Sequence, residues 1–380
     1  MLSVGGTARL WAATALLYCA VGWAYPLLPL YMAYRGLTAS EIGLVFSTAT
    51  LASLAPLVAL GRLSDILPRE VVTSLLELAF GLLMLAYSTV ASLPGFIAVH
   101  SAYALLSYSS MTLASAAALD YLGGEVGRGF GRFRTSGAVG WVLGTLSGGA
   151  IARALGVRGA IQVSAPIFWA SAVLFALGRR AGVARQRVIS ERLALSARIY
   201  GLLAAVFVTA VTNPAYYSFL PLYITKILGG DSLTASLAFS ITPLAEVPAM
   251  MYLGSLSDRV GRLKVIALCL AAYPLRYLLT SLARSPVEAI LAQLLHGLTF
   301  GGLYVVSTAY IADEVGSRGA GLALSLYTAS TTAGGLVGGY LLGCVVEREG
   351  YRAMYVVAAA ISLLSYLPLL VSHRAGRNPH

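Results

Sequence analysis

Long apolar stretches follow one another along the whole chain, separated by short polar segments. Each stretch is about 20 residues long, which is the length of helix that crosses a hydrocarbon core of about 30 Å. Backbone polar groups stay paired in such a core only if each crossing is helical. The pattern predicts twelve membrane-spanning helices. The expected spans are 8–33, 41–60, 71–90, 94–119, 135–155, 160–178, 199–227, 233–253, 264–283, 287–312, 319–344 and 351–372.

A short polar sequence occurs twice, 193 positions apart, and each copy lies between two apolar stretches. It reads GRLSDILPR at 61–69 and GSLSDRVGR at 254–262. Three further pairs keep the same order: LPLY at 28–31 and 220–223, LTAS at 37–40 and 233–236, and glycines spaced by four at 140, 144 and 148 and at 335, 339 and 343. We therefore expect a duplicated, all-α membrane protein with two pseudo-symmetric six-helix bundles, at 1–178 and 199–380, joined by an Arg-rich linker at 179–198. Internal repeats of this kind are typical of transporters.

Composition supports a membrane location: 58% of residues are hydrophobic and 11% are charged, against about 25% charged in soluble domains. The net charge of +11 would suggest nucleic acid in a soluble protein, but its distribution here does not. About 18 of the 26 basic residues fall in segments on one side of the predicted spans, with six arginines in the linker. Basic residues favour the cytoplasmic side. We therefore expect a multi-pass protein of the plasma or inner membrane with both termini cytoplasmic, and no nucleic-acid partner.

The repeated polar sequence resembles the loop signature of the major facilitator superfamily of secondary transporters, Gly-x-Leu-(Ala/Ser)-Asp-(Arg/Lys)-x-Gly-(Arg/Lys). The copy at 254–262 matches it fully, whereas the first copy has Ile66 in place of a base and Pro68 in place of glycine. The resemblance implies two six-helix bundles that work by alternating access around a central site. It also implies that the loop residues hold the cytoplasmic side closed through charge pairs. These gate residues are Asp65, Arg69, Asp258, Arg259 and Arg262.

Two further stretches resemble the lactose-permease group of proton symporters: AYPLLP at 24–29 and GRFRTSGAVGW at 131–141. The resemblance implies that Arg134 binds substrate and that Trp141 is an aromatic stacking platform. Residues seven apart share a helix face, so the two side chains are expected to point the same way. Asp120 ends the fourth predicted span. It is expected either to pair with Arg134 and bind hydroxyl groups of the substrate, or to form an ion pair at the cytoplasmic end.

In the second half, the same resemblance places Arg276 and His296 at the coupling arginine and histidine of that group. Thr299 stands where the lactose permease has a proton-carrying carboxylate, and Glu246 falls about one turn from the expected position. We expect Glu246 to carry the proton and to bind substrate together with His296. The alternatives are a structural ion pair between Arg276 and Glu246, and a histidine that is simply hydrogen-bonded in the core. Glu77, in the third span, is expected to pair locally or to extend toward the membrane surface.

Neither a nucleotide loop nor a dinucleotide fingerprint is present. The glycines at 127–131 follow an apolar helix instead of a strand, and both lysines, Lys226 and Lys264, lack the preceding glycine of a phosphate loop. We therefore expect no enzyme, no catalytic residue, no cofactor and no metal, but a monomeric transporter in the lipid bilayer with a small solute and protons as partners. The leading hypothesis is proton-coupled symport of a sugar, nucleoside or related compound. The alternatives are a proton-antiport exporter of drugs or metabolites, and a sensor or lipid-handling protein on the same fold.

Overall fold

The computed structural model describes residues 4–52, 67–122, 126–178 and 195–375, and within these ranges the regular secondary structure is entirely helical. The expected all-α fold is confirmed. The helices of the first half of the sequence are α1 (Val4–Ala24), α2 (Leu27–Tyr34), α3 (Ala39–Ala52), α5 (Arg69–Tyr87), α6 (Leu93–Leu122) and α7 (Val126–Leu177). Those of the second half are α8 (Ala197–Thr212), α9 (Pro214–Tyr217), α10 (Leu220–Lys226), α11 (Ser232–Val260), α12 (Arg262–Leu282), α13 (Pro286–Ala292), η1 (Gln293–Leu295), η2 (Gly297–Gly302), α14 (Leu303–Leu363) and α15 (Tyr366–Ala375).

Two of these helices bend sharply at glycines and account for more than one membrane crossing each. In α7 the backbone turns at Gly156, with φ 75°, and in α14 it turns at Gly316 and Gly350, with φ 67° and 84°. Such positive φ angles are accessible to glycine at little steric cost. Eight stretches of the described chain are long and apolar enough to cross a membrane, and two of them contain an internal break. Together with α3 and α6, they give the twelve crossings that the hydrophobic pattern predicts.

The chain divides into two compact units. Unit 1 comprises Met1–Leu37, Thr48–Arg187 and Asp231–Ser240, and unit 2 comprises Thr38–Ser47, Val188–Gly230 and Ile241–His380. Each unit thus takes most of one half of the sequence plus the first ten residues or so of a helix from the other half. The division at the linker that the sequence predicts would instead leave 38–47 in the first bundle and 231–240 in the second.

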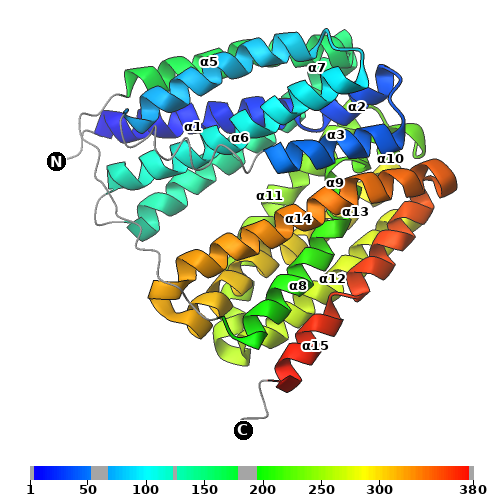
Figure 1. Ribbon diagram of the computed structural model, residues 1–380. Helices are drawn as coiled ribbons and strands as arrows, with labels where there is room; N and C mark the ends of the chain where they lie inside the picture. The colour runs from blue at the N-terminus through cyan, green and yellow to red at the C-terminus, as the bar shows by residue number, and fades with distance from the viewer. Residues whose placement is uncertain (1–3, 53–66, 123–125, 179–194, 376–380) are drawn as a thin grey trace. The chain divides into compact units, whose positions relative to one another are not determined.

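Unit 1 is built on the packing of α1 along the first part of α7 (Figure 1). Gly140 and Gly144 of α7 lie directly against the backbone carbonyls of Ala15 and Cys19 of α1, with no room for a β-carbon. Close approach through small residues stabilises helix pairs in lipid, because packing there replaces the hydrophobic effect. The glycine repeat therefore fixes how these two helices cross.

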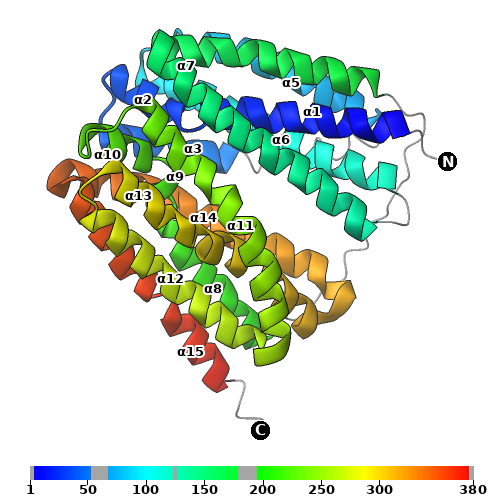
Figure 2. The ribbon, with the colours of Figure 1, turned by 180° about the vertical axis from the view of Figure 1, so that it is seen from behind.

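Unit 2 repeats this arrangement with α8 and α14, which run together in both ribbon views (Figures 1 and 2). Gly334 and Gly338 lie against the carbonyls of Phe207 and Val211, again without space for a β-carbon. The structural counterparts of Gly140 and Gly144 are therefore these two glycines. The sequence comparison had paired them with residues 335, 339 and 343, one position along the helix. Within unit 2, Gly339 and Gly343 instead pack against the start of α3.

The break between α8 and α9 at Asn213 follows from Pro214, which cannot donate a backbone hydrogen bond. The carbonyl groups near this break need partners because water is scarce at this depth. Two tyrosine hydroxyls supply them: Tyr277 donates to the carbonyl of Thr212 at 3.0 Å, and Tyr355 donates to that of Ala215 at 2.9 Å. Side chains of α12 and α14 thus satisfy carbonyl groups on either side of this break.

We predict that Gly144→Ala lowers the thermal stability of the detergent-solubilised protein, because the new methyl group collides with the backbone of Cys19. Overpacking of this kind costs about 1–3 kcal/mol. The matched control is Gly321→Ala, at an exposed helical position where a β-carbon meets nothing, and there stability should stay level or rise slightly. Equal melting temperatures for the two variants would contradict the packing role of Gly144.

Candidate functional site

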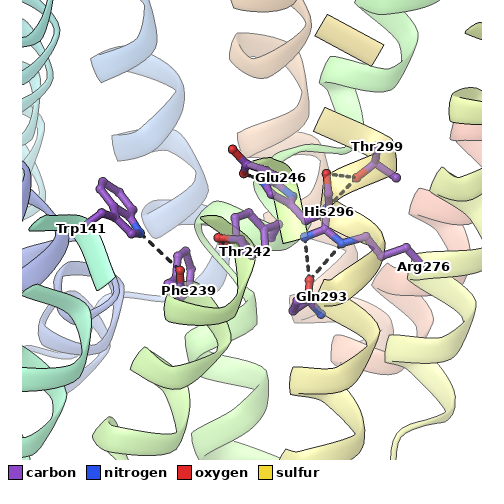
Figure 3. Close-up of polar contacts among 9 residues, drawn as sticks. Trp141, Phe239, Thr242, Glu246, Arg276, Gln293, His296 and Thr299 are labelled. Atoms are coloured by element: carbon purple, nitrogen blue, oxygen red, sulfur yellow. Dashed lines mark hydrogen bonds and ion pairs between the residues drawn. The ribbon is translucent and has the colours of Figure 1, made fainter. Parts of the chain in front are cut away.

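A polar cluster in unit 2 is centred on Arg276 of α12, which is only 3% exposed (Figure 3). Its Nε and Nη2 donate to Oε1 of Gln293 at 3.0 and 2.6 Å, and its Nη1 donates to the hydroxyl of Thr299 at 3.1 Å. The guanidinium also lies 4.6 Å from the ring centre of Tyr216, within the range of a cation–π contact. Within the described residues, the groups that contact this buried cation, Gln293, Thr299 and Tyr216, are all neutral.

Gln293 is held in place by its own hydrogen bonds. Its Nε2 donates to the carbonyl of Ala289 at 2.8 Å and to the hydroxyl of Thr280 at 3.4 Å. The hydroxyl of Thr280 donates in turn to the carbonyl of Arg276 at 2.8 Å. The amide oxygen of Gln293 is thus fixed toward the guanidinium, and the network closes on itself. A closed network of this kind holds a buried charge in one geometry.

Beside this network, Nε2 of His296 lies 3.0 Å from Oε1 of Glu246. The His296 side chain is 6% exposed and that of Glu246 is 20% exposed, so the carboxyl is the member of the pair that reaches solvent. The imidazole is held between two aromatic rings, parallel to Phe300 at 5.3 Å and tilted on Tyr216 at 4.7 Å. The hydroxyl of Tyr216 is 3.3 Å from that of Thr242, one turn before Glu246. The pair is therefore positioned by packing as well as by its hydrogen bond.

The backbone around this pair departs from regular α-helix. Glu246 lies in α11 between Pro243 and Pro248, neither of which donates a backbone hydrogen bond. His296 stands between the 3₁₀ turn η1 and the π-helical turn η2, a local form that is frequent at functional sites. Gly297 lies against the backbone carbonyl of Ala245, and Gly301 lies against the side chain of Glu246. Glycines thus allow α11 to come close enough for Glu246 to meet His296.

This arrangement can bind and release a proton. A carboxyl and an imidazole that share a hydrogen bond can each take the proton, and the partly exposed carboxyl can exchange it with water. Nδ1 of His296 is buried and has no hydrogen-bond partner among the described residues, so it is open to a donor group. The structure therefore joins Glu246 to His296, where a structural ion pair of Glu246 with Arg276 had been the alternative.

The predicted residues of unit 1 have other neighbours. Trp141 donates from Nε1 to the carbonyl of Phe239 at 3.3 Å, and both rings lie within 6 Å of Tyr25, at 5.6 and 5.9 Å between centroids. Arg134 is exposed, seven residues before Trp141 on the same helix. Asp120 pairs with Arg69 at 2.8 Å, so the structure favours the ion pair of the two roles considered for this carboxylate.

The gate residues form the same ion pair in each unit. Arg69 bonds Asp120, and Arg262 bonds Asp313 at 2.9 Å. Both pairs join residues 51 positions apart, and the two pairs are 193 positions apart, as the repeated signature is. Arg262 also bonds Asp258, at 2.5 Å, while Arg259 is exposed. Asp65 lies outside the described residues.

Sequence reasoning missed several parts of the cluster. Thr242 and Thr280 carry no signal beyond their spacing of one turn from Glu246 and Arg276. The π-helical turn after His296 has no signal of its own apart from the glycines at 297, 301 and 302. Glu77 is fully buried in α5, so the expectation that it extends to the membrane surface is wrong.

Comparison with known proteins agrees with this architecture. The family model described as MFS_1 like family matches residues 9–357. The multidrug resistance protein MdtG of Yersinia enterocolitica is 25% identical over 362 residues, covering 90% of this chain and 86% of that protein. MdtG of Escherichia coli is 24% identical over 386 residues, covering 97% and 94%.

Two solved structures share the fold at low sequence identity. The nucleoside transporter NupG superposes with a TM-score of 0.78 at 17% identity, over 97% of this chain and 99% of that one. A bacterial homolog of the human lysosomal transporter Spinster gives a TM-score of 0.79 at 13% identity, over 97% and 96%.

We predict that Arg276→Lys destabilises the protein although it keeps the charge. A lysine ammonium cannot reproduce the three directed N–H groups that bond Gln293 and Thr299. Leaving a buried acceptor unpaired costs about 1–3 kcal/mol, which a lower melting temperature in detergent will report. Arg284→Lys, at an exposed position outside the cluster, is the matched control. Equal melting temperatures for the two variants would show that the directed N–H groups of Arg276 do not stabilise the protein.

Proposed function

The chain belongs to the MFS_1-like family of major facilitator transporters, and from this premise we propose that it is a proton-coupled symporter of a small polar solute. The observation that carries the proposal is the contact at 3.0 Å between His296 and Glu246 beside the buried Arg276. An uncoupled carrier has no need of three ionisable groups within its membrane-spanning helices, where each is costly. Proton coupling would give each of these three groups a function in transport.

In this proposal Glu246 is the proton carrier and His296 its relay. With Glu246 ionised, the carboxylate accepts from His296 and is balanced by the field of Arg276. Protonation of Glu246 removes that negative charge and leaves Arg276 with neutral partners only. The two states therefore differ in net charge inside the membrane, and a difference of that size is what can bias one conformation over the other.

Each unit offers its own candidate residues for binding the solute. Tyr25, Trp141 and Phe239 form an aromatic group in unit 1, and aromatic faces bind the apolar faces of sugars or nucleobases. We assign Arg134 and Trp141 to solute binding from this unit, and Glu246 and His296 from unit 2. Asp120 is better placed with the gate, because its carboxylate is already bound to Arg69.

The gate proposal rests on the matched ion pairs of the two units. Arg69 and Arg262 each stand at the start of a helix and pair with a carboxylate of another helix, Asp120 in α6 and Asp313 in α14. We propose that each unit thereby contributes a charged latch at one side of the membrane, with Asp258 and Arg259 adding to the latch of unit 2. Under the positive-inside rule this is the cytoplasmic side, which gives both termini the same location. The protein resides in the inner membrane, and we propose that it is a monomer there.

A second candidate is export of drugs in exchange for protons. It is favoured by the two MdtG proteins, which carry the name multidrug resistance protein at about a quarter identity over nearly the whole chain. The same Glu246–His296 pair would then take up a proton outside as the drug leaves and release that proton inside as the next drug molecule binds. Uptake of uridine or lactose supports symport, and proton-driven extrusion of ethidium supports exchange.

We predict that Glu246→Gln lowers solute accumulation in liposomes about tenfold for each unit of pH gradient, since one coupled proton corresponds to a factor of ten per pH unit. The measurement is steady-state accumulation of labelled uridine or lactose with the membrane potential clamped. Exchange of solute at equal concentrations should continue, because the glutamine amide can still hydrogen-bond the solute and the conformational change remains.

The matched control is Glu288→Gln, an exposed carboxyl outside the cluster, which should accumulate as the wild type does. Symport fails if the wild type concentrates neither solute under a pH gradient. The role of Glu246 fails if its glutamine variant concentrates solute as well as the wild type does.

A further inference from the structure

Unit 1 contains a buried carboxyl group that the proposed mechanism does not use. Glu77 lies in the middle of α5, and its side chain is completely excluded from solvent. Both of its carboxyl oxygens are buried, and within the part of the chain that the structure describes neither makes a hydrogen bond. Buried polar groups in proteins are almost always paired, so this carboxyl calls for a physical explanation.

The surroundings of Glu77 are apolar and tightly packed. One turn further along α5, Phe80 stacks on Phe168 of α7 with 4.0 Å between ring centroids. Gly81 lies against the indole of Trp169, and Nε1 of Trp169 donates to the carbonyl of Leu78 at 3.3 Å. The packing of α5 on α7 thus leaves no space beside the carboxyl for solvent.

The polar side chain that faces Glu77 is Ser171 of α7. Its hydroxyl proton is already used, because Ser171 donates to the carbonyl of Ala13 in α1 at 2.8 Å. Ser171 can therefore only accept from Glu77. An ionised carboxylate has no proton to donate, whereas a protonated carboxyl has one O–H donor. A hydrogen bond that Ser171 accepts from Glu77 therefore requires the protonated carboxyl.

Charged groups elsewhere in unit 1 do not reach Glu77. At the start of α5, Arg69 bonds Asp120, and Glu70 lies beside Tyr121. Toward the other end, His100 bonds Tyr87 at 3.1 Å. Tyr103 of α6 packs edge-on against Phe80, and its phenol is neutral. Within the described residues, no cation lies against the Glu77 carboxyl to balance a negative charge.

From this geometry we propose that Glu77 is a second proton-binding site, distinct from the Glu246–His296 pair. Taking a bare carboxylate out of water without a partner costs far more than leaving the proton in place, so Glu77 holds its proton while α5 packs on α7. The proton can leave only when these helices part enough for water to enter. A part of the transport cycle that loosens this contact would then load and unload Glu77.

Infrared spectroscopy of the protein without any solute tests whether the Glu77 carboxyl is protonated. The wild type should show a carbonyl stretching band of a protonated carboxylic acid at neutral pH, and Glu77→Gln should lack that component. Glu77→Leu is a second variant that also removes the group and fills its space. Glu288→Gln, at an exposed position, should leave the band unchanged. If the band is the same in the wild type and both Glu77 variants, Glu77 is ionised and the proposal is overturned.

The role of this proton in transport rests on the proposed function and is tested in liposomes with uridine, lactose and ethidium as probes. If Glu77 carries a second coupled proton, Glu77→Gln should lower the solute gradient about tenfold per pH unit and keep exchange at equal concentrations. A variant that builds the wild-type gradient would overturn that role. Absence of transport of all three probes by the wild type would count against the proposed function alone, since the infrared result stands independently of it.

Discussion

Close approach of helices at glycine positions is the constraint on which the rest of this structure depends. In lipid, helices gain little from burying apolar side chains against one another, so packing distance decides which pairs are stable. Gly140 and Gly144 set the crossing of α1 and α7, and Gly334 and Gly338 set that of α8 and α14. Gly297 and Gly301 do the same at the functional cluster, where they bring the backbone of α11 close enough for Glu246 to reach His296.

Because water is scarce inside the membrane, each ionisable group there depends on its protein surroundings, and these surroundings differ among Arg276, Glu246 and Glu77. Gln293, Thr299 and Tyr216 surround the guanidinium of Arg276 with oriented dipoles and an aromatic face. Glu246 has an imidazole partner and partial access to solvent, so it can gain and lose a proton. Glu77 has neither, and its burial argues that it keeps a proton until the helices around it move. The two halves of the repeat therefore share an architecture but differ in their membrane-embedded charges.

Sequence reasoning could predict the helices, the duplication and three members of the cluster, because those depend on hydrophobic length, on repeated motifs and on residues that are rare in membranes. The pairing of the glycine repeats was one position wrong in the second half. A shift of one position on a helix rotates a residue by about 100°, and the spacing of the glycines alone does not determine which of them face the neighbouring helix. For Asp120 the sequence left two roles open, because Arg69, its ion-pair partner, lies on a different helix and motif spacing does not show which helices meet. The π-helical turn at 297–302 arises from tertiary packing, which local propensity does not encode.

The central claim is that solute and proton move together through the Glu246–His296 pair. The most direct measurement is the external pH of lightly buffered proteoliposomes when uridine or lactose is added without any imposed gradient. We predict that the medium becomes more alkaline as solute enters with protons, and that Glu246→Gln lowers the number of protons taken up per solute while solute still enters. Entry of solute into wild-type liposomes with no change in pH, or with acidification of the medium, would contradict it.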